Sequence, residues 1–199
     1  MICVIDYGAG NIHSVLNALR FIGAEAVLSR DPETVAAADK VLLPGVGAFG
    51  DAMEALKSSG MVKPVLEALD SGRPFLGICL GLQLLFEESE ESPGVPGLGY
   101  FKGKIRRFPE DSGLRIPQIG WNDITVRQPE SVFAPADGKH VYFVHSFYLE
   151  AEEPEIVAAT AVYGKEFHAA VQAGSVAACQ FHPEKSGAAG LDILRRWAL

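Results

Sequence analysis

The chain has 199 residues, of which 48% are hydrophobic, and this predicts a single domain over residues 1–199 with its own core. A net charge of −8, from 17 Lys and Arg against 25 Asp and Glu, argues against nucleic acid or an anionic membrane as a partner. Three widely spaced cysteines fit neither a disulfide framework nor a zinc site. We therefore expect a cytoplasmic protein without metal or cofactor that acts on small molecules or another protein.

Through the first ninety residues, short apolar runs alternate with segments of helical period, as in a parallel sheet covered on both faces. Strands are predicted at 2–6, 26–29, 40–44 and 74–78. Asn11 is the expected cap of a helix over 12–22, and Asp31 caps a second helix that begins at Pro32. A third helical stretch covers 51–70 with a second start at Pro64, and a fourth covers 80–89.

From Tyr100 onward the runs are shorter and rich in strand-forming residues. We expect strands at 101–108, 122–126, 140–149 and 155–162, a hairpin of 166–172 with 176–181, and a closing helix at 188–198. The whole pattern predicts a three-layer α/β domain with a mixed, largely parallel sheet and a β-rich C-terminal half.

The sharpest local signal is Gly77-Ile78-Cys79-Leu80-Gly81, a GxCxG sequence between a strand and a helix. Such a turn projects the middle side chain above the sheet, and glycines two residues away on either side avoid collisions with neighbouring backbone. A helix start beside the sulfur favours a thiolate. Cys79 is thus a candidate nucleophile. The alternative is a small buried hydrophobe, which is the interpretation we prefer for Cys3 and Cys179.

A thiol nucleophile needs a base, and His182-Pro183-Glu184 supplies an imidazole and a carboxylate that could orient it. Of the other histidines, His13 is expected at the surface or an interface. His140 and His168 look like strand-edge residues. His145, in the apolar run YFVHSFY, fits a core histidine as well as a functional one.

The glycine-rich segment 44–50, PGVGAFG, follows the third strand and should lie beside Cys79 at the carboxyl edge of the sheet. Its glycines would let backbone amides approach a substrate oxygen. A phosphate-binding turn or a plain tight loop is the alternative, and the single GxGxxG match within it is a weak signal.

Taken together, PGVGAFGDAM, GICLGLQLLFE, YFVHSFY and FHPEKSG, in that order, resemble the class I glutamine amidotransferases, whose fold is flavodoxin-like. Within that class the chain resembles the glutaminase subunits of imidazole glycerol phosphate synthase, which share PGVG, GWN, HPEKSG and the opening YGAGN. The matching segments run from residue 7 to residue 187.

The resemblance implies that Cys79 attacks the side-chain amide of L-glutamine, that His182 moves the proton, and that Glu184 holds the imidazole. Water would then hydrolyse the γ-glutamyl thioester. The resemblance places the oxyanion against the backbone amide of Leu80 and one from the loop of Gly45, Val46 and Gly47. Gln83 and Ser146, with Gly47, would contact the substrate.

The resemblance also implies a partner, a (β/α)₈-barrel cyclase that uses the ammonia for histidine biosynthesis. Candidate interface and channel residues are Asn11, Trp121, Asn122, Tyr142 and Lys185, for which ordinary surface or core packing is the alternative. One departure is visible, because Gln118 stands where we expect a histidine. Glutamine can donate and accept hydrogen bonds as a neutral histidine does, but it cannot carry charge.

Three other functions stay open at this stage. The first is a glutaminase of the same class that serves another synthase, such as the one for pyridoxal phosphate. The second is a cysteine hydrolase or peptidase that works alone. The third is a binding subunit that has kept the fold and lost catalysis, which the intact Cys79, His182 and Glu184 argue against.

Overall fold

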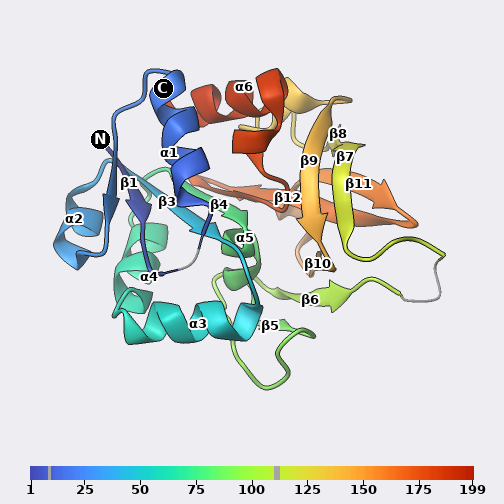
Figure 1. Ribbon diagram of the computed structural model, residues 1–199, viewed down its shortest axis with the longest axis horizontal. Helices are drawn as coiled ribbons and strands as arrows, with labels where there is room; N and C mark the ends of the chain where they lie inside the picture. The colour runs from blue at the N-terminus through green and yellow to red at the C-terminus, as the bar shows by residue number, and fades with distance from the viewer. Residues whose placement is uncertain (9, 110–112) are drawn as a thin grey trace.

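The computed structural model describes residues 1–8, 10–109 and 113–199, and Figure 1 shows a twisted sheet with helices on both faces. Within these residues the main sheet has eleven strands, with the path β2-β1-β3-β4-β13-β12-β10-β6-β5 and with β11 and β8 joined at β12. A separate two-stranded sheet pairs β7 with β9. The YGAGN turn falls partly outside the described residues, because it contains Ala9.

Five neighbouring strands form the parallel half of the main sheet. They are β2 (Ala26–Ser29), β1 (Ile2–Ile5), β3 (Lys40–Gly45), β4 (Phe75–Cys79) and β13 (Val176–Cys179). Because β13 comes from the end of the chain and lies directly beside β4, it brings the segment that follows it next to the end of β4.

The other half is mostly antiparallel and comes from the β-rich part of the chain. It contains β12 (Lys165–Ala173), β10 (Phe147–Ala151), β6 (Gly103–Arg107), β5 (Glu88–Ser89), β11 (Val157–Tyr163) and β8 (Thr125–Val126). The small sheet is formed by β7 (Gln118–Asp123) and β9 (His140–His145).

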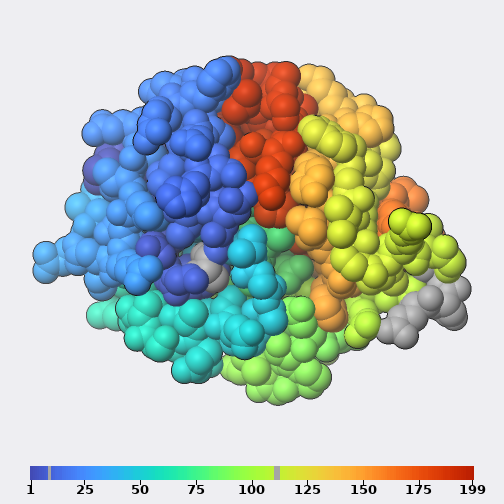
Figure 2. Space-filling view, viewed as in Figure 1, coloured from blue at the N-terminus to red at the C-terminus, as the bar shows by residue number. Residues whose placement is uncertain are grey.

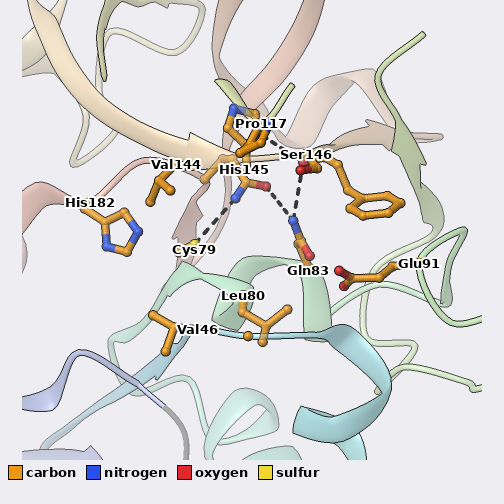
Figure 3. A pocket seen from close by; sticks show the side chains of 13 residues that line it. Val46, Cys79, Leu80, Gln83, Glu91, Pro117, Val144, His145, Ser146 and His182 are labelled. Atoms are coloured by element: carbon orange, nitrogen blue, oxygen red, sulfur yellow. Dashed lines mark hydrogen bonds between the residues drawn. The ribbon is translucent and has the colours of Figure 1, made fainter. Parts of the chain in front are cut away.

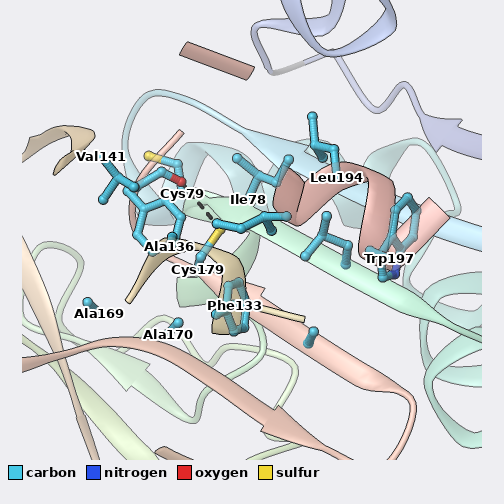
Figure 4. Close-up of a cluster of buried hydrophobic side chains, with 14 of the residues drawn as sticks. Ile78, Cys79, Phe133, Ala136, Val141, Ala169, Ala170, Cys179, Leu194 and Trp197 are labelled. Carbon is cyan, nitrogen blue, oxygen red and sulfur yellow. Dashed lines mark hydrogen bonds between the residues drawn. The ribbon is translucent and has the colours of Figure 1, made fainter. Parts of the chain in front are cut away.

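The helices divide between the two faces according to the alternation of side chains along the strands. Val4 and Leu42 face the core that contains α1 (Ile12–Phe21) and α6 (Gly187–Ala198). Their sequence neighbours Cys3 and Leu43 face the opposite core. That core packs against α2 (Pro32–Ala37), α3 (Phe49–Ser58), α4 (Val62–Asp70) and α5 (Leu80–Leu84). Figure 4 shows part of the first core, where Ile78 and Cys179 pack near Leu194 and Trp197 of α6.

The parallel half confirms the prediction closely. All four predicted strands are present within one residue at each end, and α2 has its cap at Asp31, whose carboxylate accepts from the N–H groups of Glu33 and Thr34. The hairpin of β12 and β13 and the C-terminal helix are also confirmed. The predicted α/β class with a mixed sheet is therefore correct.

Several local predictions were wrong. Asn11 precedes α1 but makes no side-chain cap bond. By contrast, the second start that Pro64 predicts within 51–70 is confirmed, because α4 begins at Val62 and has Pro64 in its first turn, where a missing N–H costs nothing. The helix expected over 80–89 ends at Leu84, because Glu88 and Ser89 pair with β6 instead.

The C-terminal half adds three more differences. The strand expected at 140–149 is two strands that break at Ser146. Gln118–Asp123 forms a strand that the sequence did not indicate, and only 125–126 of the predicted 122–126 belongs to the main sheet.

No helix in the described residues is long and apolar enough to cross a bilayer, and these residues contain no cluster of His, Cys, Asp and Glu side chains suited to a metal.

Candidate active site

Cys79 ends β4 and immediately precedes α5, in a backbone conformation with φ +56° and ψ −112°. It is the one non-glycine residue with positive φ in the described part of the chain. The turn is tight on both sides, because a Cβ at Gly81 would overlap the carbonyl oxygen of Leu43, and one at Gly77 would lie 2.9 Å from the carbonyl oxygen of Gly81. The two glycines therefore permit the turn, as the GxCxG pattern predicts.

His182 and Glu184 follow β13 and form a buried pair beside this turn. His182 Nδ1 lies 2.8 Å from Glu184 Oε1, and the two side chains are 2% and 0% exposed. Burial by itself lowers the pKa of His182, but its interactions with Cys79 and Glu184 outweigh burial and raise that pKa to about 10. His182 Nε2 makes no hydrogen bond within the described residues. The pair is built to hold a proton on the imidazole next to the sulfur.

Cys79 and His182 open into one pocket of about 370 Å³ (Figure 3). The pocket is lined by Val46, Gly47, Cys79, Leu80, Gln83, Glu91, Pro117, Val144, His145, Ser146, Phe147, Gln180 and His182. The structure thus brings together most residues singled out from the sequence. Gly45 and Glu184 stand behind the lining, Gly45 so close to Leu80 that a Cβ would come within 2.8 Å of the Leu80 Cβ. Gly47 has φ +99°.

Two polar residues of the pocket lining, Gln180 and Glu91, were missed from the sequence. Gln180 is fully buried, its Nε2 donates to Cys79 Sγ at 3.7 Å, and its Oε1 accepts from Gln83 Nε2 at 2.9 Å. A polar residue inside the apolar run VAACQF was the available signal. Glu91, in the acidic segment that separates the two halves of the sequence, accepts from the N–H of Phe49 and reaches the pocket. Nothing in its sequence context sets it apart from the other acidic residues there.

His145 and Gln118 form a neutral pair at the back of the pocket. His145 Nδ1 lies 2.7 Å from the carbonyl oxygen of Phe147, which can only accept, so Nδ1 carries the proton. Nε2 lies 2.9 Å from Gln118 Oε1, and a neutral ring with its proton on Nδ1 accepts a hydrogen bond there when the Gln118 amide is turned to present its NH₂ group. Burial lowers the pKa of His145 to about 4, which keeps the ring neutral. Because the His145 ring is neutral, its partner at position 118 needs no charge, and an uncharged glutamine can fill the place where a histidine is expected.

Three of the five predicted interface residues lie together near His182. The rings of Trp121 and Tyr142 meet edge to face at 6.1 Å, and Lys185 Nζ lies 5.6 Å from the Tyr142 ring centre. The Tyr142 ring is 6.4 Å from the imidazole of His182. Trp121 is 55% exposed. Figure 2 shows the surface of β9 (orange) between those of β7 (yellow-green) and α6 (red) on this face.

The other two candidate interface residues do not join this group. Asn122 donates from its side chain to the carbonyl oxygen of Val162, and Asn11 lies at the start of α1.

The other two cysteines, Cys3 and Cys179, are core residues as predicted. Burial raises the pKa of Cys3 to about 11 and raises that of Cys179 as well, so neither is suited to act as a thiolate.

Comparison with known proteins decides the family. The model of the family "Glutamine amidotransferase class-I" matches residues 3–199. The chain belongs to the class I glutamine amidotransferases. This amidotransferase is 50% identical to "Imidazole glycerol phosphate synthase subunit HisH" of Syntrophotalea carbinolica, over 99% of this chain and 98% of the relative. It is 48% identical to the HisH subunit of Methanothermobacter thermautotrophicus, over 99% and 97% of the two chains.

Solved structures support the fold of this amidotransferase. One described as "Crystal structure of glutamine amidotransferase" matches with a TM-score of 0.76 and 20% identity over 100% of both chains. "Structure of PurLQS from Thermotoga maritima" also matches with a TM-score of 0.76, at 22% identity, over 98% of this chain and 95% of that one. At such identities the likeness concerns the fold alone.

Proposed function

We propose that this chain is the glutaminase subunit of an imidazole glycerol phosphate synthase and hydrolyses L-glutamine to glutamate and ammonia. The observation that carries the proposal is the meeting of Cys79, on its sharp turn, with the buried pair of His182 and Glu184 at one pocket. A nucleophile, a base and an acceptor that orients the base are the three parts of a thiol-based catalytic triad. The relatives named HisH at 48–50% identity support the choice of synthase.

In the proposed reaction, His182 holds the proton of the Cys79 thiol on its imidazole, and the resulting thiolate attacks the amide carbon of glutamine. The carbonyl oxygen becomes an oxyanion, which the backbone amide of Leu80 and one from the Gly45–Gly47 loop stabilise. Collapse of this intermediate breaks the C–N bond, and the imidazolium returns its proton to the leaving ammonia. A water molecule, deprotonated by His182, then attacks the thioester and releases glutamate and the free thiol.

The pocket offers matching groups for the rest of the substrate. Gln83, Ser146 and Gly47 line it together with Cys79. In Figure 3, Glu91 lies beyond Gln83 as seen from Cys79. Because glutamine carries an α-ammonium at the end remote from its side-chain amide, we assign that cation to the Glu91 carboxylate.

The ammonia would pass to a (β/α)₈-barrel cyclase docked over the surface that carries Trp121, Tyr142 and Lys185. Exposed aromatic and basic side chains next to the catalytic imidazole support an interface there, because aromatic anchors dominate protein interfaces. Asn11 and Asn122 would lie at its margin. We place the complex in the cytoplasm, where three unpaired cysteines are compatible with the reducing conditions, and assign it no nucleic-acid or membrane partner and no cofactor.

The test is glutamate release from glutamine by the purified chain, with and without the barrel cyclase and its nucleotide substrate. We expect strong stimulation by the partner. Cys79→Ala should abolish glutamine-dependent synthesis and leave ammonia-dependent synthesis by the complex intact. Cys179→Ala, which removes a buried sulfur from the next strand, is the matched control and should keep both activities.

The other outcomes separate the alternatives. Full turnover by the isolated chain would favour a hydrolase that works alone. A stable complex with a different synthase would reassign the partner. No glutamate under any condition would favour a binding subunit.

A further inference from the structure

A fully buried carboxamide joins the nucleophile to the substrate-binding wall. Gln180 follows β13 and continues its pairing, because its backbone N–H donates to the carbonyl oxygen of Ala169. Its side chain is one of those that line the pocket. Nε2 donates to Cys79 Sγ at 3.7 Å, and Oε1 accepts from Gln83 at 2.9 Å. Both ends of one amide are therefore committed to residues of the proposed glutaminase site (Figure 3).

The orientation of this amide is fixed by a backbone carbonyl. The carbonyl oxygen of Phe147 can only accept, so the NH₂ group of Gln83, 3.5 Å away, must face it. The same NH₂ group donates to Gln180 Oε1, which leaves the NH₂ of Gln180 directed at the sulfur. Turning either amide over would set two acceptors or two donors against each other. The chain of bonds thus has a single direction, which ends at Cys79.

The surroundings of Gln180 do not otherwise call for a polar residue. Its sequence neighbours Cys179 and Phe181 are fully buried core residues. A buried amide is costly unless its donors and acceptors are satisfied, and an apolar side chain of similar size would avoid that cost. The partners at both ends of the side chain explain why an amide is present.

We propose that Gln180 is a positioning residue of the glutaminase reaction with two separable tasks. Its NH₂ group stabilises negative charge on the Cys79 sulfur and directs the sulfur for attack, because hydrogen bonds to charged groups are stronger than those to neutral ones. Its carbonyl oxygen holds the amide of Gln83, whose own Oε1 has no partner among the described residues and is free for the substrate. Gln180 neither gives nor takes a proton, since the thiol proton moves to His182.

This inference rests on the proposed function, and two substitutions separate the tasks. Gln180→Glu keeps an oxygen that accepts from Gln83 but places a second oxygen against the sulfur in place of the NH₂ group. Gln180→Leu removes both bonds at nearly the same volume. Each is measured in the complex with the cyclase for kcat and KM of glutamine, and in the full chain for the rate of Cys79 alkylation by iodoacetamide, located by peptide mass.

We expect Gln180→Glu to lower kcat and the alkylation rate about tenfold to a hundredfold with KM near the wild-type value. Gln180→Leu should lower both rates and also raise KM. Cys179→Ala, which alters the adjacent buried position and touches none of these bonds, should leave all three values unchanged. Thermal unfolding verifies that each variant is folded.

Wild-type alkylation rates in both Gln180 variants would overturn the inference, and so would equal effects of the two substitutions on kcat and KM. If Gln180→Glu does not fold, Gln180→Asn takes its place. Its shorter amide cannot reach both partners, so it should either lower kcat and the alkylation rate or raise KM, and wild-type values of all three would overturn the inference. A wild-type complex without glutaminase activity would refute the proposed function instead. The alkylation rates would still test whether Gln180 stabilises the thiolate of Cys79.

Discussion

The positive φ of Cys79 predicts an unusual response to glycine. For a residue with a Cβ, a backbone held at φ +56° costs about 1–3 kcal/mol, and glycine adopts it freely. Replacing alanine by glycine at an ordinary buried position is destabilising, because it frees the unfolded chain and removes a buried methyl group. At position 79 the relief of strain opposes that loss.

A comparison of two pairs isolates the strain. Cys179 is buried like Cys79 and lies in the neighbouring strand, where its backbone is unstrained. The free energy of unfolding is measured by urea denaturation for Cys79→Ala, Cys79→Gly, Cys179→Ala and Cys179→Gly. The entropy and burial contributions to the Ala-to-Gly difference are similar at the two positions, so the strain is what distinguishes them.

We expect the Ala-to-Gly change to cost about 1–3 kcal/mol less at position 79 than at position 179. For a chain of this length each kcal/mol corresponds to roughly 2–4 °C in Tm, so the difference is well within measurement. Equal costs at the two positions would refute the reasoning, since they would mean that the turn stores no strain.

Four further predictions follow from the site. Glu184→Gln should slow glutamate release by the complex by about a hundredfold to ten-thousandfold, because the amide holds the imidazolium less well, and wild-type turnover would contradict that role. Because the pKa of His145 is lowered from 6.5 to about 4, the unfolded chain binds its proton first, and this residue costs the fold about 2 kcal/mol on going from pH 7 to pH 5. His145→Asn should lose that part of the acid sensitivity in urea titrations at the two pH values, and an unchanged pH difference would show that the ring is not held neutral. Gly81→Ala should destabilise the chain by about 3 kcal/mol or more in the same assay, because its Cβ would overlap the carbonyl oxygen of Leu43, and a near-neutral effect would contradict the tight turn. Trp121→Ala should weaken cyclase binding at least about thirtyfold by titration calorimetry, and unchanged affinity would move the interface elsewhere.

The parallel half of the fold could be predicted because its signals are local and agree with one another. Each strand is a short apolar run, and caps such as Asp31 act within three residues. The turn at Cys79 could also be predicted from the sequence, because close backbone contacts at this turn require glycines at a fixed spacing from Cys79. The proposed triad is predicted by two short motifs, which the pairing of β13 with β4 brings side by side.

The rest depends on contacts between distant segments. The helix expected over 80–89 ends early because Glu88 and Ser89 pair with β6. The helix propensity of the segment does not predict this pairing. The strand β7 is visible only once β9 pairs with it. Gln180 and Glu91 escaped notice for the same reason, because their roles come from partners such as Gln83 and Phe49 that lie tens of residues away.

The position of β13 beside β4 also bears on when the site comes into existence during synthesis. Cys79 and Gln180 are 101 positions apart in the chain, and His182 emerges from the ribosome later still. A nascent chain that ends before β13 can form the nucleophile turn but contains neither the base nor the amide beside the sulfur. Contacts of such long sequence separation form late and slowly. A partly synthesised chain therefore carries the Cys79 thiol without His182 or Gln180 beside it, and the proposed active site is complete only when nearly the whole protein has been made.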